Sequence, residues 1–129
     1  MRVAQLPDQT KYLTELFGCI KGRDVLYRDF CKMTAEQQRG KVLLRHDVDD
    51  LLERSVAMAE LQHKCGVKAT YFILDTAPYW NPANPDMWLK INRIAELGHE
   101  IAWHNNVLTR WVVTGNKIEI DDLKSKVNK

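Results

Sequence analysis

The stretch KVLLRHDVDD, residues 41–50, decides the fold class of this 129-residue chain. Its first half, 41–45, is a compact apolar run after a glycine. Continuous apolarity, without alternation, predicts a β-strand that is covered on both faces. Its second half, 46–50, places closely spaced acidic residues directly after that strand. In parallel α/β folds, functional groups gather at the carboxyl ends of the strands, so this boundary is the first candidate for a site.

Helix and strand patterns alternate on the carboxyl side of this stretch. Helical periodicity predicts one helix over about 51–64, with Asp50 as its N-cap, and another over about 87–97. Strands are predicted over 67–74, which is rich in β-branched and aromatic residues, and over 99–104. Three prolines make 75–86 a loop. The strand–helix–strand–helix–strand order predicts an α/β domain with a parallel sheet.

The rest of the chain is assigned to flanking segments of one domain. A helix is predicted over about 9–20, and residues 1–40 form an N-terminal helical extension. Residues 41–108 are the motif-bearing core, and 109–129 are a C-terminal segment. A length of 129 residues fits a single domain of ordinary size.

Composition excludes several classes of function. With 19 basic and 17 acidic residues, the net charge is +2, and the basic residues are scattered. Such a chain has no field that would attract nucleic acid or an anionic membrane. The three cysteines are widely spaced and indicate no disulfide framework. The sequence shows neither a signal peptide nor an apolar run of membrane-spanning length, so we expect a cytoplasmic protein with no membrane partner.

Acidic and imidazole side chains lie at the predicted strand ends. Asp47 and Asp49 follow the first strand, Asp75 ends the second and His104 ends the third, and these ends should share one rim of the sheet. Carboxylates and imidazoles are ligands for zinc and related divalent ions. Such an ion lowers the pKa of a bound water and polarises a carbonyl, while a carboxylate that does not coordinate can accept the proton.

Three blocks together resemble the polysaccharide deacetylase family, carbohydrate esterase family four. Residues 42–49 are similar to its first motif, in the branch that reads HDVD. Residues 69–72 resemble its second strand, and 97–104 resemble its second motif, a GHEI strand that ends in a metal-binding histidine. The resemblance implies a distorted (β/α) barrel, a bound zinc or similar ion, and hydrolysis of the acetamide C–N bond of N-acetylated sugars.

The resemblance also implies roles for individual residues. Asp47 would be the catalytic base, and Asp49 and His104 would bind the metal. Val48 separates the two aspartates, so their roles could be exchanged. Tyr79 and Trp80, in the proline-rich loop, are candidates for contact with the carbohydrate substrate, although loop aromatics equally often anchor a loop to the core.

The chain departs from the family pattern in two ways. The family's second histidine falls on Leu108, which cannot coordinate, and the amide oxygen of Asn105 or Asn106 would be a poorer ligand. A TIM-type barrel also needs about 200 residues or more, so the chain is expected to form only its first three strands. An alternative function is therefore a catalytically inactive fragment with a binding role or none, whose exposed strand edges favour self-association.

Four further aromatic and imidazole residues are expected to have structural roles. His46 is expected to be a buried or flanking polar residue. His99 should alternate away from the face of His104 and be structural. Trp88 and Trp103 are expected in the core.

Overall fold

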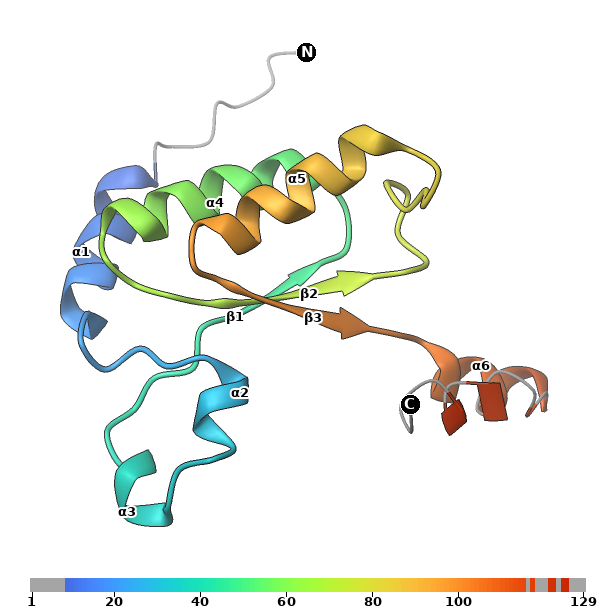
Figure 1. The fold of residues 1–129 in the computed structure, drawn as a ribbon, viewed down its shortest axis with the longest axis horizontal. Coiled ribbons are helices and arrows are strands. Elements are labelled where there is room, and N and C mark those ends of the chain that lie inside the picture. The colour runs from blue at the N-terminus through green and yellow to red at the C-terminus, as the bar shows by residue number, and fades with distance from the viewer. Residues whose placement is uncertain (1–8, 116, 118–120, 123, 126–129) are drawn as a thin grey trace, which may run out of the picture.

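The computed structural model describes residues 9–115, 117, 121–122 and 124–125. Its centre is a sheet of three parallel strands in the order β1-β2-β3. These strands are β1 (Arg45–Val48), β2 (Thr70–Leu74) and β3 (Glu100–His104). Helices α4 (Leu52–Lys64) and α5 (Pro85–Glu96) connect them and cover one face of the sheet (Figure 1). The predicted α/β domain with a parallel sheet is confirmed, and the sheet is open.

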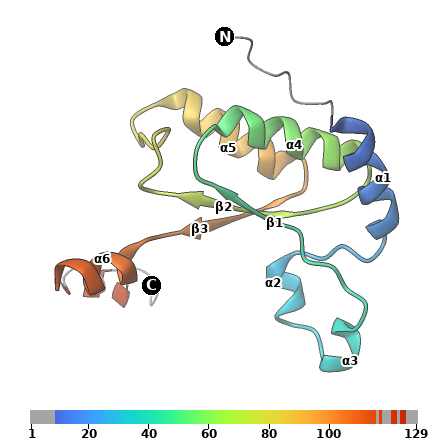
Figure 2. The same cartoon turned by 180° about the vertical axis from the view of Figure 1, so that it is seen from behind.

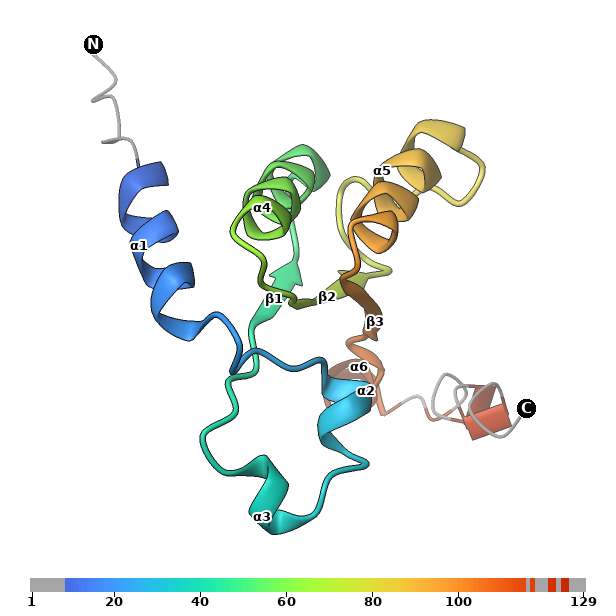
Figure 3. The same ribbon diagram turned by 60° about the vertical axis from the view of Figure 1, so that its left-hand side comes forward.

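The other helices surround this unit. Helix α1 (Thr10–Ile20) lies beside α4. Helices α2 (Tyr27–Phe30) and α3 (Ala35–Gln38) lie on the side of the sheet away from α4 and α5, as Figures 2 and 3 show. Helix α6 (Val107–Thr114) continues from β3 and lies beyond the sheet (Figure 1). No helix among the described residues combines the length and apolarity needed to cross a bilayer.

Side chains of the strands alternate between the two faces of the sheet. Val48 and Ile73 face the helices and are buried, whereas Arg45 and Asp47 are exposed on the opposite face. We call this second face the open face. The core between the sheet and α4 and α5 consists mainly of apolar residues, including Val48, Leu52, Ala59, Tyr71, Ile73, Ile91 and Ile94.

The first strand lies further along the chain than predicted. The apolar run that begins at Val42 was expected to be the strand itself, but β1 begins at Arg45. Val42 instead forms an isolated parallel bridge: its amide donates to Arg23 at 2.8 Å, and its carbonyl accepts from Val25 at 3.0 Å. The N-terminal extension therefore satisfies the backbone groups of Val42. As a consequence, Asp47 lies within β1 rather than after it.

A buried polar network joins β1 and β2 to α4. The Tyr71 hydroxyl donates to Gln62 Oε1 at 2.6 Å, and Gln62 Nε2 lies 2.7 Å from His46 Nε2. His99 accepts from the amide of Ala69 at 3.1 Å and contacts the Tyr71 ring edge-on. Burial lowers the pKa of both histidines. The structural roles predicted for His46 and His99 are confirmed.

Two expectations about local structure were wrong. Asp50 does not cap α4, because the N-cap position is Leu51 and it makes no side-chain hydrogen bond. Trp88 and Trp103 are not in the core: they are 40% and 44% exposed. Both rings line a cavity near the edge strand β3, which leaves them partly open to solvent.

Candidate metal centre

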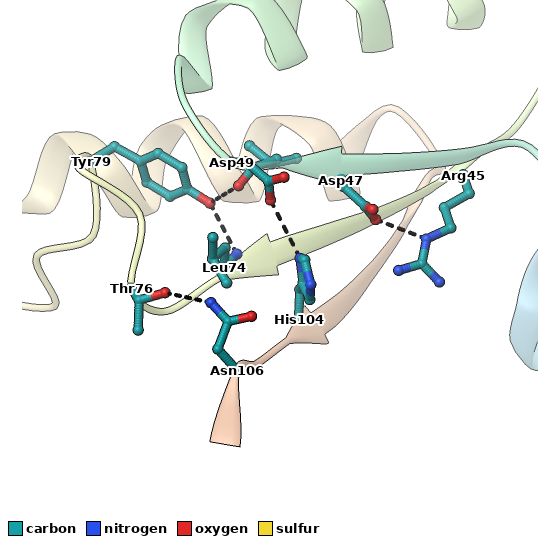
Figure 4. A network of polar contacts seen from close by, with 9 residues as sticks. Arg45, Asp47, Asp49, Leu74, Thr76, Tyr79, His104 and Asn106 are labelled. Atoms are coloured by element: carbon teal, nitrogen blue, oxygen red, sulfur yellow. Dashed lines mark hydrogen bonds and ion pairs between the residues drawn. The ribbon is translucent and has the colours of Figure 1, made fainter. Parts of the chain in front are cut away.

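Asp49 and His104 lie together at the carboxyl end of the sheet. Asp49 directly follows β1 and His104 ends β3, so the central strand β2 lies between them. Leu74, the register partner of His104, occupies that position on β2. The two side chains meet over the open face, with Asp49 Oδ1 3.3 Å from His104 Nδ1 (Figure 4). The predicted convergence of these two residues is therefore present.

The His104 imidazole is the more enclosed partner. Its side chain is 27% exposed, against 55% for Asp49. Its Nδ1 atom is buried, and no described residue makes a well-oriented hydrogen bond to it. Burying a ring nitrogen without a hydrogen-bond partner costs free energy of folding. Together with the nearby carboxylate oxygen, this nitrogen forms a pair of ligands of the kind that first-row divalent ions bind. The chemistry of the pair thus suits a zinc-like ion.

The pair supplies two protein ligands, whereas catalytic zinc sites usually have three. The described residues contain no group of three or more His, Cys, Asp or Glu side chains that could hold a metal ion. Leu108 lies on α6 and is 63% exposed. Asn105 accepts from the amide of Val107 at 3.2 Å, and Asn106 Nδ2 donates to Thr76 Oγ1 at 3.2 Å. Both asparagines therefore already hold the start of α6 in place.

Asp47 lies on the same open face as this pair, but further from the carboxyl end of the sheet. It is paired in register with Phe72, two residues before Leu74, so it lies about 7 Å towards the amino end of the sheet. Arg45 Nε donates to Asp47 Oδ1 at 2.8 Å, and the Arg45 guanidinium stacks on the Phe72 ring at 4.1 Å. Figure 4 shows the Asp47 carboxylate turned towards Arg45. This hydrogen bond also raises the pKa of Arg45.

Tyr79 is fixed at the same rim by two backbone contacts. Its hydroxyl donates to the carbonyl of Val48 at 2.6 Å and accepts from the amide of Leu74 at 3.1 Å (Figure 4). Burial raises the pKa of this phenol. Tyr79 therefore ties the loop to the ends of β1 and β2, next to Asp49, and acts as an anchor of the rim.

Trp80 and Asp75 lie apart from the pair. Both line a cavity together with Ile73 and Trp103, which project to the helix-covered side of the sheet. The expectation that Asp75 joins Asp49 and His104 was wrong, because a residue one position past Leu74 points to the other face. A second cavity, of ≈ 690 Å³, lies among α1, α4 and α5, and its lining includes none of the predicted site residues.

Sequence reasoning missed the contribution of Arg45. This residue precedes Asp47 by two positions on one strand, so both side chains must lie on the same face. That parity could have revealed the ion pair once the extent of β1 was known. The contacts of Asn106 with Thr76, and of Tyr79 with Val48, join segments about 30 residues apart and leave no comparable signal in the sequence.

Comparisons of the chain with protein-family models, with curated proteins and with solved structures found no match.

Proposed function

We propose that this chain carries the metal-binding rim of a hydrolase that removes acetyl groups from N-acetylated sugars. The observation that supports the proposal is the 3.3 Å approach of Asp49 Oδ1 to the buried His104 Nδ1 across the central strand. The pair lies at the carboxyl ends of parallel strands, which is where this architecture places catalytic groups. In this proposal the three strands are the first part of a (β/α) barrel, and the open face is its interior.

Asp49 and His104 would hold a zinc ion, with a third ligand from outside the described residues. The bound ion would supply Lewis acidity towards the acetamide carbonyl and towards a water molecule. Asp47 would accept the proton of the attacking water, since its second oxygen is not the one that Arg45 holds. Arg45 would fix the orientation of that carboxylate. Transfer of that proton to the departing nitrogen would accompany cleavage of the C–N bond, which releases acetate and leaves an amine on the sugar.

The test is acetate release from an N-acetylglucosamine oligomer by the full chain in the presence of zinc. We expect Asp49→Asn and His104→Gln to abolish release and to lower the zinc affinity at least about ten-fold. Asp47→Asn should lower release by about 10²–10⁴-fold, the range of general-base catalysis, and leave zinc binding unchanged. Asp50→Asn is the matched control, because Asp50 is an exposed neighbour outside the pair. Zinc-loaded wild-type chain that releases no acetate would refute the catalytic proposal.

A second candidate function is a non-catalytic, self-associating binding domain. Strands β1 and β3 are both edge strands of the described sheet. Helix α6 exposes Leu108, Val112 and Val113, which are 63%, 76% and 78% exposed. Unpaired edges and exposed apolar side chains favour association between chains. The two-ligand donor set supports this candidate as well, because it falls short of a complete catalytic site.

Light scattering coupled to size-exclusion chromatography separates the two candidates. Self-association predicts a mass above that of one chain, returning to one chain in a Leu108→Lys, Val112→Lys double variant. Thr109→Lys, at an exposed position of the same helix, is a suitable control for the added positive charge. A compact monomer at all concentrations would remove the self-association candidate and leave the hydrolase proposal untouched.

A further inference from the structure

A cavity of ≈ 530 Å³ lies on the helix-covered side of the sheet, near its β3 edge. Three of the four tryptophans of the chain line it: Trp80 from the loop after β2, Trp88 from α5 and Trp103 from β3. Its volume falls within the range of small-molecule sites, about 300–1,000 Å³. Because Trp103 and His104 are adjacent on a strand, their side chains point to opposite faces, and the cavity is separate from the candidate metal centre.

Two of the indole rings are held in fixed orientations. Trp80 and Trp88 meet edge to face, with ring centroids 5.8 Å apart and planes at 70°. Trp88 Nε1 donates to the carbonyl of Pro82 at 2.9 Å, which fixes the ring relative to the loop. Two steeply inclined aromatic walls and a third indole from the sheet give a concave aromatic surface. Trp88 and Trp103 remain 40% and 44% exposed, so this surface is open to a ligand.

The cavity is also lined by a carboxylate with one buried oxygen that has no hydrogen-bond partner among the described residues. Of the described residues that line it, Asp75 alone is charged. Its Oδ1 atom is buried, and no described residue donates a hydrogen bond to it. Burying a carboxylate oxygen without a partner is unfavourable, and a cation beside it offsets that cost. The faces of indole rings also attract cations, and Trp is the strongest of the aromatic residues in this respect.

We propose that this cavity binds a small organic cation of the ammonium class, with its alkyl groups against Trp80, Trp88 and Trp103 and its charge towards Asp75. The indoles alone would accept any apolar group. The Asp75 carboxylate, with its unpaired Oδ1, would favour a cation over an uncharged ligand of the same shape. This inference does not rest on the proposed hydrolytic function, because the cavity shares no residue with the metal pair.

Choline is the probe, and its uncharged analogue, with a tert-butyl group in place of the trimethylammonium group, is the matched control. Binding is followed by the indole N–H signals in a nitrogen-15 correlation spectrum of the full chain. Trp111, on α6 and outside the lining, serves as an internal reference. We expect choline to shift the signals of the three lining tryptophans with saturation and to leave Trp111 unmoved. The analogue should bind at least about ten-fold more weakly.

Asp75→Asn preserves the shape of the side chain and removes its charge. We expect it to weaken choline binding about ten-fold or more and to leave the weak binding of the analogue unchanged. Trp103→Leu should weaken the binding of both ligands, and a circular dichroism spectrum that matches the wild type shows that either variant is folded. Equal binding of choline and its analogue, or full retention of choline binding by Asp75→Asn, would overturn the proposal. Absence of any saturable shift in the wild-type chain would overturn it equally.

Discussion

The hydroxyl of Tyr79 donates a hydrogen bond of 2.6 Å to the carbonyl of Val48, the last residue of β1. The same oxygen accepts from the amide of Leu74 at 3.1 Å, so one side chain joins the ends of two adjacent strands. Asp49 follows Val48 directly, and Leu74 lies beneath the approach of Asp49 to His104. The rim that positions the candidate metal pair therefore depends on Tyr79.

Tyr79→Phe is expected to destabilise the fold. It removes a donor and an acceptor at a partly buried position and should lower the free energy of unfolding by about 1–3 kcal/mol. Urea denaturation followed by circular dichroism measures this change. Tyr12→Phe is the control, because Tyr12 is 62% exposed on α1 and its substitution should leave the free energy of unfolding almost unchanged. Equal stability of the two variants would show that the rim does not depend on the Tyr79 hydroxyl.

The buried histidines make stability dependent on pH. Burial lowers the pKa of His46 and of His99 in the folded chain. Above their unfolded pKa of about 6.5, both histidines are neutral in either state, and their full contribution to stability is present. As the pH falls below that value, the unfolded chain binds protons that the folded chain does not. The free energy of unfolding therefore decreases with falling pH until the pH reaches the lowered pKa values of the folded chain.

Urea denaturation at about pH 7.5 and about pH 5.5 tests this dependence. The wild-type chain should be less stable at the lower pH, and His46→Gln should show a smaller difference between the two conditions. Tyr12→Phe is the control, since Tyr12 lies exposed on α1 and this substitution should leave the difference unchanged. Identical pH dependence in wild type and His46→Gln would exclude a contribution of His46.

Arg45→Gln should have little effect on stability. The Arg45 and Asp47 side chains are 45% and 40% exposed, and ion pairs at such positions contribute about 0–1 kcal/mol. In contrast, the loss of Arg45 frees the Asp47 carboxylate to rotate. If Asp47 is the catalytic base, acetate release should fall in Arg45→Gln while zinc affinity stays the same. A fall in zinc affinity would mean that Asp47, and not only Asp49, contributes to metal binding.

Local periodicity was sufficient to predict the α/β class, the parallel sheet and the approximate bounds of α1, α4 and α5. It also predicted the approach of Asp49 to His104, because strand ends of a parallel sheet share one rim. The position of β1 could not be predicted, since the backbone of Val42 pairs with Arg23 and Val25 in a segment without a strand pattern. Trp88 and Trp103 were assigned to the core from the pattern of apolar residues, and that pattern does not reveal whether a neighbouring element covers them.

The proposed metal site is tested most directly by titrating the full chain with zinc in a calorimeter. The pairing of Asp49 Oδ1 with His104 Nδ1 predicts one saturable zinc site per chain. The zinc affinity should fall at least about ten-fold in Asp49→Asn and in His104→Gln. Asp50→Asn should bind zinc like the wild-type chain. Absence of stoichiometric zinc binding, or equal affinity in all four proteins, would contradict the account.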